Sequence, residues 1–157
     1  MVTRALTVTY SIIVVYLRPQ EYDKNHTRLT FGGDCIDYPW GVSTPTSDLT
    51  TTKILFNSTI STPGATLVTM DIKNFYLNTP LSRYEYMHMK LESLTDEIIK
   101  EYGLRELATN GWVYIDIHKV MYGLPQAGLL SNKWLTKRLD KKGYYPCQHT
   151  PGMCHHV

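Results

Sequence analysis

Runs of apolar residues along the chain predict a protein that mixes strands and helices. β-Branched and aromatic residues fill 6–17 without interruption until Pro19, which predicts a first strand. A shorter run at 27–31 ends at a Gly-Gly pair, and a hairpin is the simplest connection between these strands. The continuous β-favouring run at 65–72 is typical of a central strand covered on both faces.

The second half of the chain alternates between the same two kinds of element. Strands are predicted at 86–91 and 112–119, and helices at about 47–60, 93–102 and 129–142. In the last helix, helical spacing places one set of side chains toward the core and the Lys/Arg set outward. The inward set is Leu130, Trp134, Leu135 and Leu139. This order of elements predicts an α+β fold.

Composition narrows the class of protein without identifying it. The chain has 157 residues, of which 43% are hydrophobic and 19% charged, with a net charge of +2. That length suits one domain with a real core, and the small charge excludes an obvious disordered tail or coiled coil. A near-neutral total still allows a local basic face, and the basic excess gathers at 133–142. That segment fits either a solvated helix face or a phosphate-contacting one.

The cysteines and the N-terminal segment favour an intracellular protein without a membrane partner. Cys35, Cys147 and Cys154 are odd in number and widely spread, which suits a reducing compartment better than a disulfide scaffold. The spacing of Cys and His at 147–156 matches no common structural zinc pattern. The apolar patch at 12–17 is too short for a signal peptide or a membrane span.

Asp71 is the first candidate for chemistry. It closes the predicted strand at 65–72, and a carboxylate on a rigid strand end suits metal binding. An Asp at such a position also serves often as a helix cap or turn former, so both roles remain open on this feature alone.

Three segments, taken in order, resemble one family. Segment 70–81 (MDIKNFYLNTPL) resembles the first catalytic motif of copia-type retrotransposon reverse transcriptases, and 121–128 (MYGLPQAG) resembles their template and nucleotide grip. Residues 28–30 before the Gly-Gly pair resemble the fingers strand of the same family. The resemblance implies a single truncated reverse transcriptase domain over 1–157. It would comprise fingers strands at about 1–45 and mixed fingers and palm at about 46–157, with an antiparallel palm sheet packed on helices.

The family joins nucleotides to a primer end with two magnesium ions. By resemblance, Asp71 would be the catalytic residue and the metal ligand, assisted by the backbone carbonyl of Ile72. Tyr76 would lie beneath the sugar of the incoming nucleotide and exclude a 2′-hydroxyl by a steric clash. The alternative for Tyr76 is a core aromatic.

Further nucleotide and template contacts follow from the same resemblance. Arg28 would hold the triphosphate through its planar guanidinium, and Gln126 would contact the incoming nucleotide and the template. Lys73, Pro125 and Gly128 would face the template and primer. The ordinary alternatives are an exposed strand arginine for Arg28, a loop amide for Gln126 and a surface position for Lys73. Acidic and neutral residues in the fingers turn, where the family tends to be basic, weaken the expected triphosphate grip.

The third motif of the family, with two consecutive aspartates, does not occur in the sequence. Because Mg²⁺ needs several carboxylates, we expect a fragment of an RNA-directed DNA polymerase that is inactive alone. Its expected partners are template-primer, deoxynucleotide triphosphates and the remainder of a retrotransposon polyprotein, in a cytoplasmic virus-like particle. Two alternatives remain: a non-catalytic nucleic-acid-binding remnant that uses Arg28, the 133–142 face and the tyrosines, or a product without a stable fold or a function.

Overall fold

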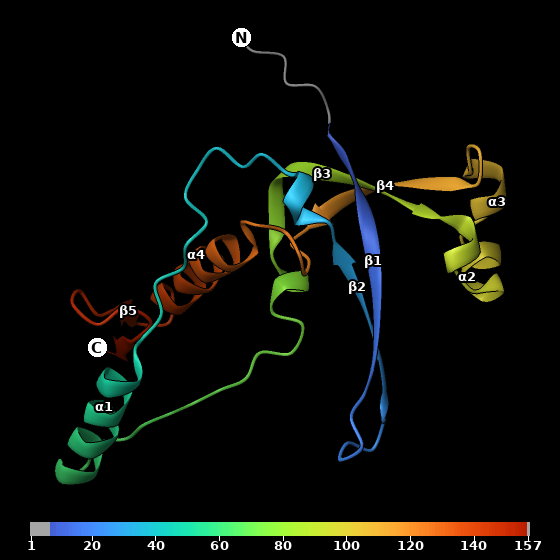
Figure 1. Cartoon of the computed structure of the whole chain (residues 1–157). Helices are drawn as coiled ribbons and strands as arrows, with labels where there is room; N and C mark the ends of the chain where they lie inside the picture. Colours follow the sequence, from blue (N-terminus) through green and yellow to red (C-terminus); the bar gives the residue numbers. More distant parts are fainter. Residues whose placement is uncertain (1–6, 157) are drawn as a thin grey trace.

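The computed structural model describes residues 7–156 and has a four-stranded sheet at its centre (Figure 1). The sheet order is β2-β1-β3-β4, and a separate two-stranded sheet pairs β5 with β6. The strands are β1 (Val8–Leu17), β2 (Asn25–Phe31), β3 (Pro80–Lys90), β4 (Trp112–Lys119), β5 (Tyr144–Pro146) and β6 (Cys154–His156). The helices are α1 (Leu49–Ser61), α2 (Asp96–Glu101), α3 (Leu104–Leu107) and α4 (Ala127–Asp140), with short 3₁₀ turns η1 (Gly33–Cys35), η2 (Tyr76–Asn78) and η3 (Leu91–Ser93).

The α+β expectation is confirmed, but the sheet is mixed and not antiparallel. β1 pairs with β2 and β3 with β4 in antiparallel fashion, whereas β1 and β3 run parallel, with Thr9 opposite Met87. The predicted hairpin between the first strands is confirmed, although the predicted start of β1 at Leu6 lies outside the described residues. A parallel pair needs a long connection, and here that connection includes α1 and the extended chain around it.

The central strand predicted at 65–72 is wrong. This segment has no regular secondary structure, and most of its side chains are exposed. The segment has β-favouring residues but no neighbouring strand to pair with. Because β-propensity largely reflects packing against neighbours, the composition alone does not make it a strand. The sheet centre is formed by β1 and β3 instead.

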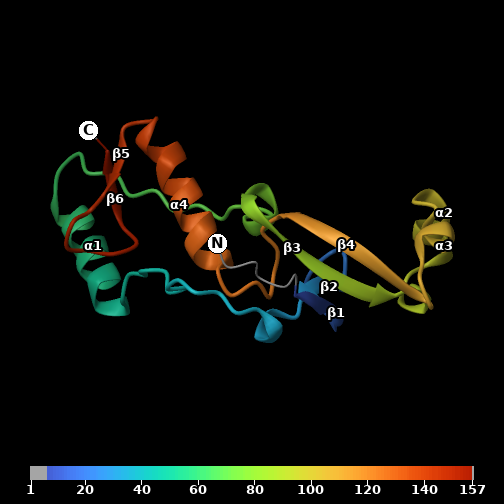
Figure 2. The same ribbon diagram turned by 90° about the horizontal axis from the view of Figure 1, so that it is seen from above.

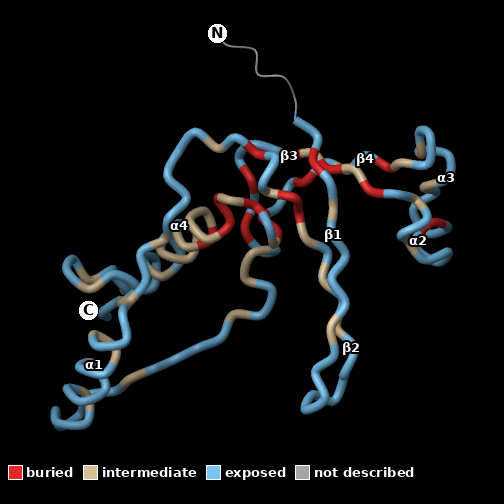
Figure 3. Tube along the Cα trace, viewed as in Figure 1, coloured by how far each residue is buried: buried red, intermediate tan, exposed pale blue. Residues whose placement is uncertain are grey.

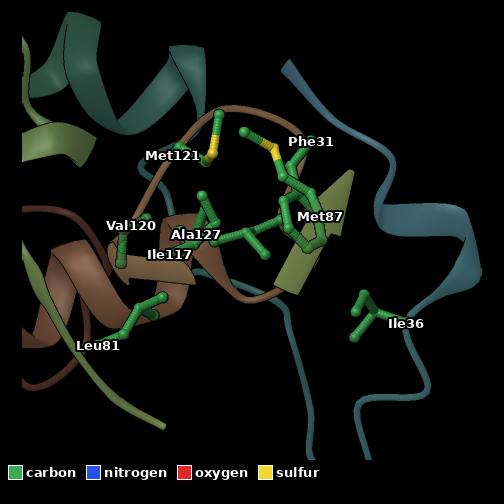
Figure 4. Close-up of a cluster of buried hydrophobic side chains, with 9 residues drawn as sticks. Phe31, Ile36, Leu81, Met87, Ile117, Val120, Met121 and Ala127 are labelled. Atoms are coloured by element: carbon green, nitrogen blue, oxygen red, sulfur yellow. The ribbon is translucent and has the colours of Figure 1, made fainter. Parts of the chain in front are cut away.

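The core lies where β3, β4 and the start of α4 meet the end of β2 (Figures 3 and 4). Phe31, Met87 and Val120 are almost fully buried there, with Leu130 packed against the cluster. On α4 the deepest side chains are Ala127 and Ser131, while the predicted inward set is half-buried. Small side chains at the start of α4 thus let the helix approach the sheet closely.

The molecule is elongated, since α1 and the β5–β6 hairpin lie at one end of it and α2 and α3 at the other (Figures 1 and 2). α1 has no buried residue, and its Ile60 side chain is 85% exposed. None of the helices within residues 7–156 combines the length and the apolar character that crossing a membrane requires.

Candidate nucleic-acid interface

Arg28 lies on β2 and is packed between two tyrosine rings. Its guanidinium carbon is 4.2 Å from the ring centre of Tyr122 and 5.8 Å from that of Tyr16. Its Nη2 also donates to the Tyr16 hydroxyl at 3.4 Å. The residue is half-buried, and the cation–π contacts hold its guanidinium against the two rings.

Tyr122 is placed by the loop that joins β4 to α4. The Phe31 N–H donates to the Tyr122 carbonyl at 2.7 Å, which seats this loop on the end of β2. Gly123 has a φ of 94°, and a Cβ there would overlap the Phe31 carbonyl oxygen. Gly33 in turn has no room for a Cβ against the Gly123 carbonyl. The glycines predicted at these motifs therefore allow two backbones to touch.

Tyr76 also contacts Tyr122. The two rings meet edge to face, with centres 5.1 Å apart and planes at 72°. Tyr76 begins η2 and packs against the hydrophobic core, so the core-aromatic alternative holds for part of its ring. Two residues predicted from widely separated motifs, Arg28 and Tyr76, are thus joined through Tyr122.

The same contacts continue along the β1–β2 hairpin. Tyr16 stacks on His26, with ring centres 5.5 Å apart and planes at 18°. The Arg18 guanidinium carbon lies 5.1 Å from the Tyr16 ring centre. We name this continuous set the cation–aromatic row. Its members are Arg18, Tyr16, His26, Arg28, Tyr122 and Tyr76.

Glu21 neutralises one end of the row. Its carboxylate lies 2.6 Å from Arg18 and 3.0 Å from His26. The hydrogen bond from Arg18, with smaller contributions from His26, holds the pKa of Glu21 below its usual value of 4.5. Arg28 has no carboxylate within ion-pairing distance among the described residues, so within the row it is the basic residue that no carboxylate neutralises.

The Gln126 side chain is buried and is not available to contact a nucleotide or a template. It is 1% exposed, and its Nε2 donates to Glu85 at 3.3 Å. Glu85 is itself buried and accepts from Arg83 at 2.7 Å. Because a carboxylate can only accept, this pairing orients the Gln126 amide, and its buried Oε1 has no hydrogen-bond partner. Gln126 thus fixes the loop that carries Tyr122.

Asp71, Ile72 and Lys73 lie apart from any strand end. They follow the irregular segment 65–70, with Asp71 and Lys73 exposed and Ile72 half-buried. No hydrogen bond or ion pair joins Asp71 or the Lys73 side chain to the cation–aromatic row in the part of the chain that the structure describes. The rigid strand-end carboxylate expected from the sequence is therefore absent from this arrangement.

The residues present do not fit a magnesium centre. Within residues 7–156, no group of three or more His, Cys, Asp or Glu side chains could hold a metal ion. Asp71 alone supplies one carboxylate, whereas Mg²⁺ is held by several oxygen ligands. Cys147 and His155 do approach each other, at 3.8 Å between Sγ and Nδ1, without a third ligand.

The remaining predicted template contacts have packing roles. Pro125 is half-buried beside Gly33, where a Cβ would lie 3.0 Å from the proline Cδ. Gly128 lets the segment before α1 pass close to α4, because a Cβ there would lie 2.8 Å from the Thr44 Oγ1. Both positions shape the loop and the helix start, which agrees with close packing at this motif.

The sequence pointed to the tyrosines only as a group and singled out neither Tyr122 nor Tyr16 as a member of the interface. Tyr122 stands within the 121–128 motif, but the motif alone does not show that its ring faces Arg28. Tyr16 stands opposite His26, a register that the hairpin pattern did not fix.

Comparison of the chain with models of known families, with curated proteins and with solved structures found no match.

Proposed function

We propose that this chain is part of a copia-type RNA-directed DNA polymerase, and that on its own it binds nucleic acid without extending a primer. The observation that carries the proposal is the position of Arg28 over Tyr122, with Tyr76 against the same ring. The sequence resemblance had assigned nucleotide contacts to Arg28 and Tyr76 separately, and the fold gives them a common neighbour.

The row combines the groups that single-stranded nucleic acids need. A guanidinium donates through a planar fork that matches phosphate oxygens, and aromatic faces stack on bases of any sequence. Arg28 supplies the fork, while Tyr16, Tyr76 and Tyr122 supply rings spaced along the hairpin and the adjoining loop. We therefore expect binding that depends on salt and tolerates changes of sequence.

Binding by the row is tested by substituting Arg28. Fluorescence anisotropy with a labelled RNA–DNA primer-template and with single-stranded RNA gives the Kd at salt concentrations of about 50 and 200 mM. We expect Arg28→Gln to raise the Kd roughly tenfold at the lower salt, since it removes a charged phosphate contact. Arg105→Gln is the matched control, because Arg105 is exposed on α3 and forms an ion pair with the exposed Asp96.

Two results would contradict nucleic-acid binding by the cation–aromatic row. If wild-type protein does not bind at low salt, the chain is not a nucleic-acid-binding module. If Arg28→Gln and Arg105→Gln bind alike, the contact lies elsewhere, and the exposed basic residues of α4 become the next candidate. These are Lys133, Lys137 and Arg138 on the helix, followed by Lys141 and Lys142.

Catalytic incompleteness is tested by primer extension on an RNA template with Mg²⁺ or Mn²⁺. We expect no product above background, because Asp71 is the single acidic residue of its motif and lies on an irregular segment. Extension by the wild type that disappears in Asp71→Asn would show instead that the chain is an active polymerase. Lys53→Gln, a change of an exposed residue on α1, serves as the control for incidental loss.

A further inference from the structure

Side chains that bind soft metal ions are concentrated on the β5–β6 hairpin. Five of the ten residues at 147–156 are cysteine or histidine, out of nine in the whole sequence, so more than half of these residues fall in one short segment. The segment forms the loop and the second strand of the hairpin, and every residue of β5 and β6 is exposed. Thiolates and imidazoles are the usual ligands of Zn²⁺ in structural sites.

The register of the hairpin divides these side chains between its two faces. Directly opposed residues point to the same face of a sheet, and neighbours along a strand point to opposite faces. Tyr145 pairs with His155, so His155 shares a face with Tyr145 and with Cys147, two residues further along. Cys154 and His156 flank His155 on β6 and therefore lie on the other face.

Cys147 and His155 are in contact. The Sγ of Cys147 lies 3.8 Å from the Nδ1 of His155, and the cysteine is free of any disulfide. With Zn–S bonds of about 2.3 Å and Zn–N bonds of about 2.1 Å, a tetrahedral angle sets sulfur and nitrogen about 3.6 Å apart. The observed spacing is close to one edge of such a site, and a small side-chain rotation brings both atoms to a common ion.

A single chain supplies two ligands of the four that a structural zinc site needs. Within residues 7–156, no third His, Cys, Asp or Glu side chain joins the pair. His155 is exposed, Cys147 is half-buried, and the hairpin lies at one end of the elongated molecule (Figures 1 and 2). Another molecule can therefore approach the pair without any rearrangement of the core.

We propose that Cys147 and His155 form half of a zinc site, and that the same two residues of a second copy complete it. A twofold axis through the ion relates the two halves and gives a Cys₂His₂ ligand set. When the ion binds, each thiol releases its proton to solvent and its sulfur lone pair forms the Zn–S bond, while each imidazole donates the lone pair of Nδ1. Two thiolates balance the charge of Zn²⁺, so the site adds no net charge to the contact between the copies.

The other face of the hairpin is less suited to the same role. Among the described residues no contact joins the Cys154 sulfur to a histidine nitrogen. The His156 ring packs instead against Tyr144, with ring centres 4.6 Å apart. Cys154 and His156 therefore provide matched control positions. The cation–aromatic row contributes nothing to the hairpin, so the zinc site stands independently of the proposed nucleic-acid binding.

Analytical ultracentrifugation in a buffer with a phosphine reductant tests the site. We expect a monomer in EDTA and a dimer when zinc is added, with one zinc bound per two chains by metal analysis. Cys147→Ser and His155→Gln should each raise the zinc concentration for half-dimerisation by at least about tenfold, the loss caused by removing even a hydrogen-bond partner of a ligand. Cys154→Ser and His156→Gln should leave it unchanged.

Cobalt in place of zinc gives an independent measurement. A thiolate bound to Co²⁺ produces charge-transfer absorption, which should appear with wild-type protein and Cys154→Ser and be absent with Cys147→Ser. Several results would overturn the proposal: a monomer in the presence of zinc, one zinc per chain, or equal losses in Cys147→Ser and Cys154→Ser. A dimer that persists in EDTA would do the same. Far-UV circular dichroism without metal confirms that each variant is folded as the wild type is.

Discussion

At the residue scale, Glu85 is a buried carboxylate held by two hydrogen-bond donors. It is 5% exposed, and one of its oxygens accepts from both Arg83 and Gln126. Arg83 is well exposed and can return to water when its partner is lost, whereas Gln126 cannot. The bond to Gln126 ties β3 to the start of α4, and so fixes the loop that presents Tyr122.

Replacing Glu85 should therefore cost stability. In Glu85→Leu the Gln126 amide stays buried with neither end paired, and we expect the free energy of unfolding to fall by about 1–3 kcal/mol. Urea unfolding followed by circular dichroism measures the change. Glu92→Leu is the control, because Glu92 is 75% exposed at the side chain and pairs with an exposed lysine. Its effect should stay within about 0.5 kcal/mol. Equal effects in the two variants would show that the buried contact is not stabilising.

At the element scale, some helices are stabilised by their own capping residues and others by packing against the core. α1 is stabilised by its cap. Its N-cap Asp48 accepts from the Thr51 N–H at 2.9 Å and from the Thr51 hydroxyl at 2.6 Å. No residue of α1 is buried, so packing adds little to it. α4 is stabilised by packing, because the residues near its start lie in the core and its N-cap residue makes no side-chain cap bond.

The cap makes α1 sensitive to acid. The hydroxyl of Thr51, and then its backbone N–H, hold the pKa of Asp48 below its usual value of 3.8. Because the folded helix lowers this pKa, the carboxylate stabilises the helix fully at pH values above its usual pKa. The stabilisation is lost as the pH falls from there through the lowered pKa. We expect the Cα chemical shifts of 49–61 to move toward coil values over that range.

Asp48→Asn separates the cap from other effects of acid, since an amide oxygen caps a helix without titrating. The variant should keep the same helical shifts from neutral to acidic pH. If it loses them as the wild type does, protonation elsewhere unwinds α1, and the role assigned to Asp48 is wrong.

At the scale of the whole molecule, the chain exposes far more surface than a compact protein of its mass. Its accessible area is 12028 Å², against about 8,000 Å² expected for a folded monomer of this size. The excess comes from α1, the extended segments beside it and the far half of the β1–β2 hairpin (Figure 3). Val15 and Leu17 on that hairpin are 70% and 63% exposed.

Stability should accordingly be concentrated in the sheet centre. We expect backbone amides of Met87 and Val113 to be protected from hydrogen exchange about 100-fold more than those of α1, because local opening costs little where nothing is packed. Exchange measured by NMR or mass spectrometry at neutral pH gives the comparison. Similar protection in α1 would mean that another surface covers it, and protection nowhere would favour the alternative that the chain has no stable fold.

Local patterns in the sequence determined most of the elements of this protein. Strands at 8–17, 25–31 and 112–119, and helices at 49–61 and 127–140, lie close to where periodicity, caps and glycines placed them. The strand predicted at 86–91 begins earlier, at Pro80, and the helix predicted at 93–102 is shorter, with α2 at Asp96–Glu101 after the turn η3. These signals work because each depends on neighbours within a few residues. The nucleotide contacts of Arg28 and Tyr76 came from the resemblance of their motifs and remain predictions, whereas Gln126, assigned such a contact by the same resemblance, is buried against Glu85.

Only the tertiary structure decided which of these elements meet. The run at 65–72 has the composition of a central strand but gains no pairing partner, since β1 and β3 pair with each other instead. Arg28 and Tyr76 come together because Phe31 and Gly123 seat the Tyr122 loop on the end of β2, a contact between segments far apart in the chain. Gln126, just before α4, is buried through a tertiary contact as well, because Glu85 on β3 pairs with its amide. Strand pairing and buried polar contacts depend on the whole fold, and so composition and spacing along the chain could not fix them.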